Sequence, residues 1–542
     1  MPTLPRPTPD RFAAARARTR ALGDTFPLQS IGSAVSEACA RYPDRMAIEV
    51  FERGERATFA AFEALTHRYA QALTRMGIAK GDRVGLMLPN RLAYPALFIA
   101  LARLGAVHVP VNTRYTADEI AYVLGDSGAR LLLHDGQFAK VVAGLPEDLR
   151  RRLAVADIAE GDGAFDRIAA ASPETPLASG PAGPDDLANI QYTSGTTGFP
   201  KGCMLTHDYW LVLARAALAW DAAPAGRILS AQPYFYMDPQ WITLKALLSG
   251  ATLVIAPGLS SSRFLGWLID HNIEWCMFPL LMTRQPERPE EAQTALKQVA
   301  TFGWPPETCR DFRRRFGVTA REAFGMTEIG LGTWMPPELD EMYASGSVGF
   351  AAPCRETTIR NEAGAPVATG ETGELWVRGR SIFQGYWNRP EANAEAFREG
   401  RWFRTGDLFR KDADGFLYLV GRLKDMIRRS QENIAAREVE AVICALPGIE
   451  DAAAVPVPDP VRGEEVKLYV QLKPGTRRDA MPVELILDHA RAHLAKFKVP
   501  RYLAYVEGFP RTPSNKIEKK ALLAGVDDLR FGAFDAVEGI WR

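Results

Sequence analysis

This chain of 542 residues is poor in cysteine and has no formal net charge at pH 7. Its six cysteines are scattered without a CxxC spacing, which argues against a zinc site and a disulfide framework and is typical of a reducing cytoplasm. Lys plus Arg and Asp plus Glu both number 65, so no net field attracts nucleic acid or an anionic membrane. We therefore expect a cytoplasmic protein without a nucleic-acid partner.

Membrane and metal signals are also sparse. The longest apolar run, residues 96–111, is interrupted by Arg103 and is too short to span a bilayer. Arginines are frequent between residues 11 and 20, but no apolar segment of a secretory signal follows them. The seven histidines form no metal-binding pattern, and His207 is expected only to support a helix start. These features predict a soluble protein without stable membrane insertion.

What the chain does contain is material for several domains. Apolar residues make up 47% and charged residues 24%, as in ordinary globular proteins, and the length exceeds what one compact core supports. Residues 1–25 are rich in Pro, Arg and Ala, and we expect them to form a loosely held arm.

Hydrophobic patterning alternates between strands and helices. The expected strands cover residues 84–88, 106–111, 130–133, 252–255 and 275–278, and the expected helices 94–104, 116–124, 241–248 and 264–271. Such alternation predicts parallel sheets covered by helices. Short β-rich pieces follow Gly346 and predict a small antiparallel subdomain. Beyond residues 421–425 a small α+β domain is expected, with helices over 435–445 and 483–494 and strands over 452–457 and 466–472.

One stretch concentrates glycine and hydroxyl residues: residues 192–202, with the sequence YTSGTTGFPKG. Glycines allow several backbone N–H groups to converge, hydroxyls add donors, and Lys201 adds the charge that a polyphosphate needs. The spacing is not that of a P-loop. The alternative is a flexible surface loop.

Five further segments follow in order. They are residues 303–306 (GWPP), 324–328 (FGMTE), 402–407 (WFRTGD), 421–425 (GRLKD) and 513–516 (PSNK). Together with residues 192–202 they resemble the signatures of the adenylate-forming superfamily, which includes acyl-CoA synthetases, aryl-CoA ligases, luciferases and peptide-synthetase adenylation domains. The resemblance covers nearly the whole chain from about residue 30.

The resemblance implies an α/β fold with a hinged second domain. A large N-terminal domain, residues 26–422, would hold two α/β subdomains and a small β-barrel-like subdomain. A hinge at Lys424 would connect it to a small α+β C-terminal domain, residues 423–542.

It also implies a reaction. A carboxylic acid attacks the α-phosphate of ATP, giving an acyl-adenylate and pyrophosphate, and coenzyme A then forms a thioester. The cofactors implied are ATP, Mg²⁺ and coenzyme A, and the partner is a small-molecule carboxylic acid, with a homodimer left open. Lys516, Thr327 and Glu328 would be catalytic, and Glu328 would also bind Mg²⁺. The residues implied to bind ATP are Thr193, Ser194, Gly195, Thr196, Thr197, Lys201, Gly303, Trp304, Pro305, Phe324, Gly325, Asp407 and Arg422.

The acyl pocket would be lined by aromatic side chains and one carboxylate. Its expected residues are Tyr236, Met237, Asp238, Trp241 and Phe302. The sequence of this region most resembles that of crotonobetaine/carnitine-CoA ligases. Asp238 among aromatic rings would suit a cationic acid. The alternative is an aromatic cluster that packs the sheet, with Asp238 capping the helix that Pro239 begins. Because Phe302 and Trp304 are bulky, we expect a small or medium polar acid.

The coenzyme A channel departs from the family pattern. Its expected residues are Arg429, Ser430, Gln431 and Glu432, and Gln431 stands where the family commonly has glycine. A glutamine there would narrow the path of the pantetheine arm. Three hypotheses about the function follow: an acid:CoA ligase, an adenylate-forming enzyme with another acceptor such as an amine, and a nucleotide-binding protein that catalyses no reaction.

Overall fold

The computed structural model describes residues 6–159, 161–177, 182–193, 200–429, 432–512 and 516–542. The chain divides into two compact units. The first comprises residues 1–357 and 377–403, and the second comprises residues 358–376 and 404–542. The expected boundary at residues 422/423 and the hinge at Lys424 stay predictions.

The larger sheet of the first unit is mostly parallel. Its order is β15-β14-β13-β12-β11-β9-β10-β1-β2. The parallel strands are β1 (Met46–Val50), β9 (Arg227–Ser230), β10 (Thr252–Ile255), β11 (Trp275–Met277), β12 (Gln298–Thr301) and β13 (Ala320–Met326). The antiparallel edges are β2 (Glu55–Thr58), β14 (Gly330–Trp334) and β15 (Phe350–Ala351).

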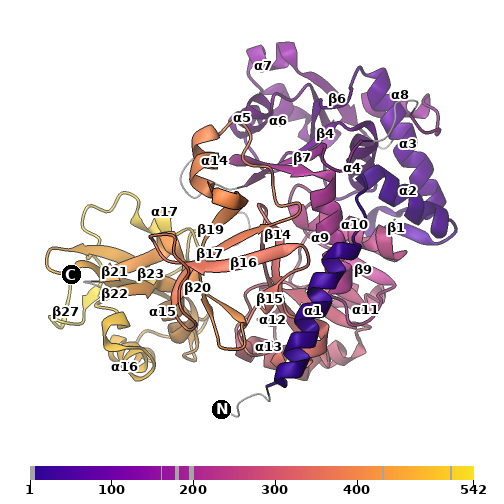
Figure 1. Cartoon of the computed structure of the whole chain (residues 1–542). Coiled ribbons are helices and arrows are strands. Elements are labelled where there is room, and N and C mark those ends of the chain that lie inside the picture. Colours follow the sequence, from indigo (N-terminus) through magenta and orange to yellow (C-terminus); the bar gives the residue numbers. More distant parts are fainter. Residues whose placement is uncertain (1–5, 160, 178–181, 194–199, 430–431, 513–515) are drawn as a thin grey trace. The chain divides into compact units, whose positions relative to one another are not determined.

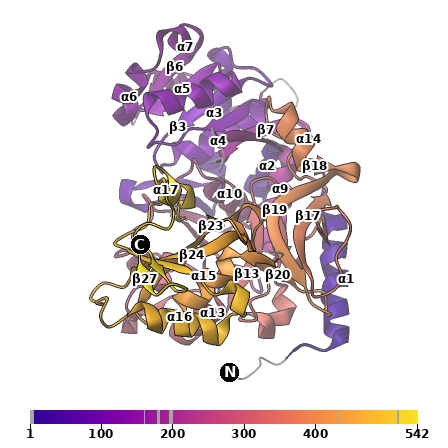
Figure 2. The same ribbon diagram turned by 90° about the vertical axis from the view of Figure 1, so that its left-hand side faces the viewer.

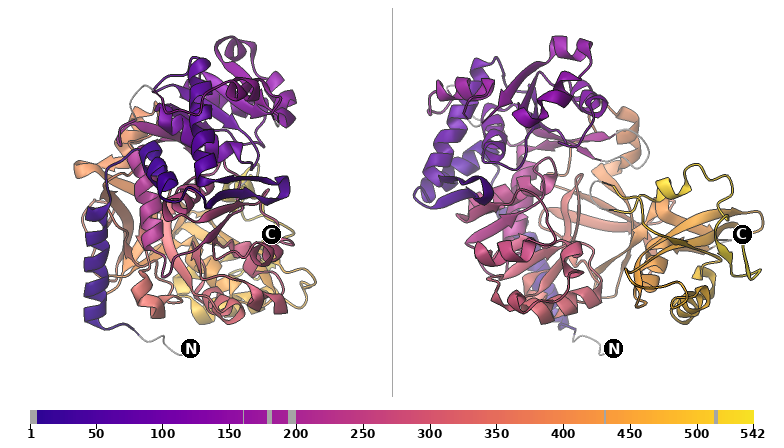
Figure 3. Two further views of the ribbon diagram at one scale, coloured as in Figure 1. Left: turned by 90° about the vertical axis from the view of Figure 1, so that its right-hand side faces the viewer. Right: turned by 180° about the vertical axis from the view of Figure 1, so that it is seen from behind.

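A second sheet of the same unit has the order β6-β5-β3-β4-β7-β8. Its strands are β3 (Arg83–Met87), β4 (Val107–Pro110), β5 (Leu131–Asp135), β6 (Ala154–Ile158), β7 (Leu187–Thr193) and β8 (Lys201–Thr206). All pairs except β7–β8 are parallel. The two α/β subdomains expected from the alternating pattern are therefore confirmed (Figures 1 and 3).

Buried helices complete the interior of the first unit. Every residue of α4 (Ala93–Leu104) is buried, as expected for a helix that is apolar on all sides. It packs with α2 (Ile31–Arg41), α3 (Phe59–Arg75) and α10 (Met237–Ser249), and α10 packs on α9 (His207–Ala219). Other helices are α5 (Ala117–Ser127), α6 (Ala139–Ala143), α7 (Glu147–Arg152), α8 (Ala164–Ala170), α11 (Phe264–Asp270), α12 (Leu280–Thr283), α13 (Pro306–Phe316) and α14 (Pro390–Ala396).

Two predicted helix starts are confirmed. Thr116 and Glu119 form the expected capping box at α5, with the Thr116 N–H donating to Glu119 Oε2 at 2.8 Å. His207 begins α9, and its Nδ1 accepts a hydrogen bond from the Ile31 N–H at 3.2 Å. His207 therefore supports the packing of α9 against α2.

The expected loose arm is wrong for its described residues. Residues Pro9–Thr25 form α1, whose Phe12 and Ala15 are buried. Arg11 Nη2 donates to the Glu338 carbonyl at 2.6 Å, and the Arg16 guanidinium lies 4.7 Å from the Phe350 ring centroid. α1 is therefore a helix that packs on η4 (Pro337–Met342) and lies beside β15 (Figure 1). Composition alone did not indicate it because only every third or fourth side chain meets the surface beneath.

Strands between residues 355 and 422 form a separate five-stranded sheet where the small antiparallel subdomain was expected. Their order is β16 (Arg355–Arg360), β17 (Thr372–Gly379), β19 (Trp402–Lys411) and β18 (Phe397–Arg398), with β20 (Leu417–Arg422) paired to β19. The pairs β18–β19 and β19–β20 are antiparallel.

The second unit contains the predicted α+β domain. α15 (Ala436–Cys444) and α16 (Val483–His493) lie side by side against the β23 (Ile449–Asp459) and β24 (Gly463–Leu472) hairpin (Figure 2). The sheet also contains β21 (Met426–Arg429), β22 (Glu432–Ala435), β25 (Tyr502–Val506), β26 (Phe534–Asp535) and β27 (Ile540–Trp541), and α17 (Lys519–Leu523) precedes β26. The sequence analysis did not predict the β21–β22 hairpin or β25 to β27.

Candidate functional site

The glycine- and hydroxyl-rich run links two antiparallel strands. Thr193 ends β7 and Lys201 opens β8, and these two residues are paired in register. A Cβ on Gly202 would lie 2.5 Å from Ile190 Cγ2, so this glycine is needed for close packing of the hairpin. Ser194, Gly195, Thr196 and Thr197 lie outside the described residues.

Lys201 and Glu328 meet at the same tyrosine. The Lys201 ammonium lies 5.0 Å from the ring centroid of Tyr386, whose hydroxyl donates to Glu328 Oε1 at 2.8 Å. Burial and the neighbouring Glu328 carboxylate raise the pKa of Tyr386. The phenol therefore stays protonated and remains a hydrogen-bond donor to the carboxylate.

Backbone pairing places Tyr386 there. Residues 383–387 run beside β8: the Met204 N–H donates to the Gly385 carbonyl at 3.0 Å, and the Trp387 N–H donates to the Gly202 carbonyl at 2.8 Å. The Phe383 N–H donates to the Glu328 carbonyl at 2.8 Å. The sequence analysis missed Tyr386, because it belongs to none of the motifs.

Thr327 lies against the start of α10. Its hydroxyl is 3.5 Å from the sulfur of Met237, and its carbonyl accepts a hydrogen bond from the Tyr209 hydroxyl at 2.8 Å. The structure thus brings a residue expected at the α-phosphate next to a residue expected in the acyl pocket.

A buried glutamate supports the turn after β12. Glu322, only 4% exposed, accepts hydrogen bonds from the Gly303 N–H at 2.7 Å and from the Thr301 hydroxyl at 2.6 Å. Gly303 has φ of +75°, a conformation that favours glycine. Glu322 was also missed from sequence, although it lies two residues before Phe324.

The other residues expected near adenine divide into two groups. Trp304 is 5% exposed and packs edge-on against Phe278 and Phe312 in the core. Phe324 is buried at the end of β13, and a Cβ on Gly325 would lie 2.6 Å from the Gly330 carbonyl. The Trp304 indole therefore helps to form the core beneath the turn, while Pro305 immediately precedes α13.

Four of the five expected acyl residues lie at the start of α10, and the fifth, Phe302, follows β12 and meets the Trp220 ring. Tyr236 precedes the helix and is partly buried, with its pKa raised by desolvation. Asp238 Oδ1 accepts from the Trp241 indole N–H at 3.1 Å. Because Tyr236, not Asp238, occupies the N-cap, the alternative in which Asp238 caps the helix is wrong in that detail. Trp241 is buried, whereas Phe302 is 39% exposed.

In the second unit, Asp407 and Arg422 face each other across β19 and β20. Arg422 Nε donates to Asp407 Oδ1 at 3.0 Å. Among the described residues, Asp407 Oδ2 is buried and has no hydrogen-bond partner. Desolvation raises the pKa of Asp407, and the charge of Arg422 opposes this shift. A buried carboxylate oxygen of this kind fits a hydroxyl donor.

The residues expected in the coenzyme A channel are only partly described. Arg429 is buried, with Nε 2.7 Å from Glu465 Oε2 and Nη1 donating to the Phe497 carbonyl at 2.7 Å. Its guanidinium is therefore engaged within the second unit. Ser430 and Gln431 lie outside the described residues, and of Glu432 only the backbone in β22 is described.

Lys424 and Lys516, the two lysines of the second unit for which a role was predicted, occupy exposed positions. Lys424 lies in the short helix η6 (Leu423–Asp425). The Lys516 N–H donates to Thr512 Oγ1 at 3.2 Å, and its carbonyl accepts from the Thr512 N–H at 2.8 Å. These bonds fix the backbone of Lys516.

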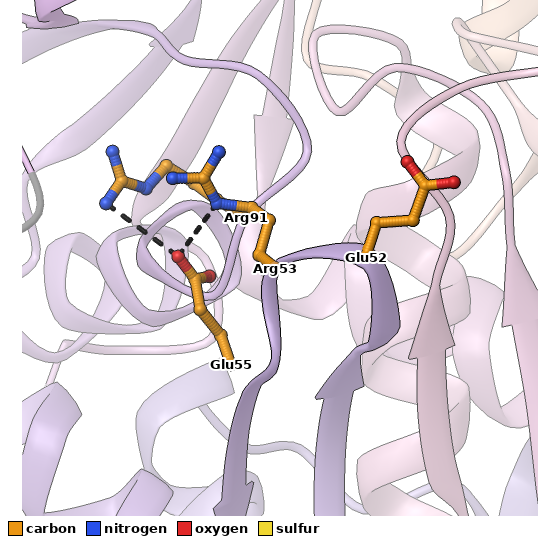
Figure 4. A pocket seen from close by; sticks show the side chains of 4 residues that line it. All are labelled: Glu52, Arg53, Glu55 and Arg91. Atoms are coloured by element: carbon orange, nitrogen blue, oxygen red, sulfur yellow. Dashed lines mark hydrogen bonds and ion pairs between the residues drawn. The ribbon is translucent and has the colours of Figure 1, made fainter.

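A charged cavity lies apart from the predicted site residues. It has a volume of about 500 Å³ and is lined by Glu52, Arg53, Glu55 and Arg91 (Figure 4). Glu55 Oε1 lies 2.9 Å from Arg53 Nε and 3.9 Å from Arg91 Nη2, and Glu52 pairs with Arg263. Since these charges compensate one another, the cavity offers no field of one sign to a polyphosphate.

None of the helices within the described ranges has the length and apolar character needed to cross a membrane.

Family models match most of the chain. The model described as AMP-binding enzyme matches residues 35–387. The model described as AMP-binding enzyme C-terminal domain matches residues 438–516.

Two curated relatives share about a third of their residues with the chain. A long-chain-fatty-acid–CoA ligase of Mycobacterium tuberculosis is 32% identical over 479 residues, covering 86% of this chain and 92% of the relative. A crotonobetaine/carnitine–CoA ligase of Escherichia coli is 33% identical over 476 residues, covering 84% and 91%.

A solved structure shares the fold. ATP-bound MatB from Rhodopseudomonas palustris superimposes with a TM-score of 0.83 at 27% identity, covering 91% of this chain and 98% of that one.

Proposed function

The chain belongs to the AMP-binding enzyme family, and from that membership we propose that it is an ATP-dependent carboxylic acid:CoA ligase acting on a small or medium polar acid. Its curated relatives are named CoA ligases, which identifies the enzyme class as an AMP-forming acid–thiol ligase. The acid, the acceptor and the roles of single residues are the proposed part.

One observation carries the proposal. Thr327 and Glu328 are adjacent in sequence, and Glu328 connects through Tyr386 to Lys201 at the end of the phosphate run, while Thr327 contacts Met237 at the start of the expected acyl pocket. The groups expected to hold phosphate and acid are therefore neighbours, as a reaction between the two requires.

The first step joins two anions. A carboxylate oxygen forms a bond to the α-phosphorus of ATP, the bond from that phosphorus to pyrophosphate breaks, and an acyl-adenylate results. Positive charge and oriented donors must therefore be in place beforehand. Lys201 and Thr193 would hold the β- and γ-phosphates, Thr327 the α-phosphate, and Lys516 would bridge the attacking carboxylate and the α-phosphate.

The residues present fit the nucleotide and its metal. The buried Asp407 Oδ2, without a partner among the described residues, would accept a ribose hydroxyl, with Arg422 beside it. Glu328 is an anionic oxygen ligand of the kind that Mg²⁺ prefers, and its neighbour Thr327 would bind Mg²⁺-bound phosphate. Bound Mg²⁺ would neutralise phosphate charge.

The second step would use the thiol of coenzyme A. The thiolate forms a bond to the acyl carbon and AMP leaves. By the family pattern, rotation about Lys424 exchanges the faces presented by the second domain between the two steps. Gln431 keeps an alternative open, namely an adenylate-forming enzyme that uses another acceptor or has impaired thiolation.

The acceptor can be tested by product analysis. Wild type and Gln431→Gly are incubated with ATP, Mg²⁺, coenzyme A and an acid panel, and the acyl-CoA is measured by mass spectrometry. We expect thioester from both, formed faster by Gln431→Gly, because removing the side chain widens the pantetheine path. If both variants make acyl-adenylate but neither makes thioester, coenzyme A is not the acceptor.

The acid can be tested separately by comparing substrates in the adenylation step. We expect carnitine-like and other small polar acids to support pyrophosphate release better than unbranched fatty acids of equal length. The reason is that Asp238 and the rings of Tyr236 and Trp241 suit a polar or cationic group. A preference for the plain fatty acids would remove this part of the proposal.

A further inference from the structure

Lys245 places a charge in the interior of the first unit. Its side chain is 0% exposed on α10, with Nζ 2.5 Å from Asp221 Oδ2 and donating to the Ala217 carbonyl at 2.9 Å. Desolvation lowers the pKa of Lys245 and raises the pKa of Asp221. A buried ion pair adds little stability over apolar residues of similar size, but its directional bonds can fix one arrangement of the core.

The ion pair is connected to Trp241 through the ring of Trp275. The Lys245 ammonium lies 4.5 Å from the centroid of the Trp275 ring, a cation–π contact. Trp275 in turn meets Trp241 edge-on, with centroids 5.8 Å apart and planes at 83°. Trp275 is fully buried and contacts both the Lys245 ammonium and the Trp241 ring.

The ion pair is also connected to Phe302, through Gln298 and Trp220. Asp221 Oδ1 accepts from Gln298 Nε2 at 3.0 Å, and the same amide nitrogen donates to the Trp220 carbonyl at 3.2 Å. The Trp220 ring, anchored by its indole N–H on the Met335 carbonyl at 2.9 Å, meets Phe302 edge-on at 6.2 Å. The ion pair is thus connected to both bulky rings of the expected acyl pocket.

We propose that the Lys245–Asp221 ion pair is a positioning element that fixes Trp241 and Phe302 and so limits the length of the acid that the enzyme accepts. The proposal rests on the proposed function, in which these two rings line the acyl pocket. Lys245 and Asp221 act through Trp275, Gln298 and Trp220 and touch no reacting atom. Their directional bonds hold the rings in one arrangement, whereas an apolar pair would allow the rings to repack.

The test is the double variant Lys245→Met/Asp221→Asn, which leaves no unpaired charge. Acid-dependent pyrophosphate release is measured for unbranched acids from acetate to dodecanoate. We expect kcat/KM for the longer acids to rise about tenfold or more relative to the shortest ones, as pocket changes of a few methylenes produce. The change should lie in KM for the acid, with KM for ATP unchanged.

A second buried ion pair provides the control. The side chains of Arg315 and Glu291 are 5% exposed each and lie 2.5 Å apart in the same unit, and Arg315 also donates to the carbonyls of Thr283 and Gln285. The variant Arg315→Met/Glu291→Gln should leave the acid-length profile unchanged, even if it lowers the thermal midpoint by as much as Lys245→Met/Asp221→Asn does.

Three results would overturn the proposal. The first is an unchanged length profile in a folded Lys245→Met/Asp221→Asn variant, and the second is an equal shift in the control. If the double variant does not fold, Trp275→Leu is measured instead, because this change removes the contact with Trp241 without leaving an unpaired charge. The third result is an unchanged acid-length profile in Trp275→Leu. If wild type releases pyrophosphate with none of the acids tested, the proposed function and this inference both fail. If wild type is active but the double variant keeps the same acid-length profile, only this inference fails.

Discussion

Asp407 is a residue whose contribution to folding and proposed contribution to binding oppose each other. Asp407 is 3% exposed, and its Oδ1 accepts a hydrogen bond from Arg422, while its Oδ2 has no partner within the described ranges. Desolvation raises its pKa, so the folded chain holds the proton more tightly than the unfolded chain does. Stability therefore falls as the pH rises from the unfolded to the folded pKa, and the cost persists above that window.

Replacing Asp407 by Asn should separate the two contributions. At pH 8 we expect a thermal midpoint no lower than that of wild type, because the cost of burying a charge is removed. KM for ATP should rise about tenfold or more, because a charged acceptor for the ribose is lost. Thermal unfolding and steady-state kinetics check both.

The exposed Asp528, paired with Arg530 in the same unit, provides the control for this change. Asp528→Asn should leave KM for ATP unchanged. A lower thermal midpoint with unaltered KM in Asp407→Asn would show that Asp407 is a structural residue.

Single residues were predictable from sequence where a motif spans them. Lys201, Thr327 and Glu328 were named from their local patterns, and the structure brings them into one neighbourhood. Tyr386 and Glu322 were not named, because each acts through a contact with a residue distant in sequence: Tyr386 with Glu328, and Glu322 with the N–H of Gly303. Such contacts depend on strand pairing and leave no local signal.

At the scale of elements, α1 shows how a composition-based expectation fails. A segment rich in arginine and alanine can be disordered or can be a surface helix, and the difference lies in a few buried side chains. Phe12 is 6% exposed, and Arg11 and Arg18 pair with Glu341 and Glu338. The surface on which α1 packs includes Glu338, Glu341 and Phe350, which are distant in sequence, so no local pattern reveals it.

Phe12→Ala measures whether α1 contributes to stability. We expect a loss of about 2–3 kcal/mol in the first unit, since a buried phenylalanine side chain is removed. Denaturant unfolding of the full chain gives the value. Arg20→Ala, on the exposed face of the same helix, should change stability by less than about 0.5 kcal/mol. Equal, negligible effects of both changes would mean that the segment is loosely held after all.

Strongly periodic elements were predicted well, and short strands poorly. β10 matches its expected range, 252–255, and α4, α11 and α16 each lie within one residue of theirs. The β21–β22 hairpin was not recognised, because Met426–Arg429 and Glu432–Ala435 lack a clean alternation of apolar and polar residues. Their pairing is fixed instead by β24, which β21 joins through Arg429 and Gly463.

At the scale of the whole molecule, the ordered motifs determined the family before any contact was known. They cover both units, and family models match 35–387 and 438–516. The acid is less accessible to sequence reasoning, because Trp241 and Phe302, which are expected to line its pocket, contact Trp275 and Trp220, two residues that no motif includes. The hinge at Lys424 remains a prediction about motion between two steps of a reaction.

The central claim is that Lys201 and Lys516 jointly neutralise ATP while an organic acid attacks its α-phosphate. The most direct measurement is carboxylate-dependent exchange of labelled pyrophosphate into ATP by wild type and by Lys201→Met/Lys516→Ala. Wild type should exchange only with acid present, and the double variant should be slower by about 100-fold or more. Absence of exchange with every acid tried, or full activity of the double variant, would contradict the account.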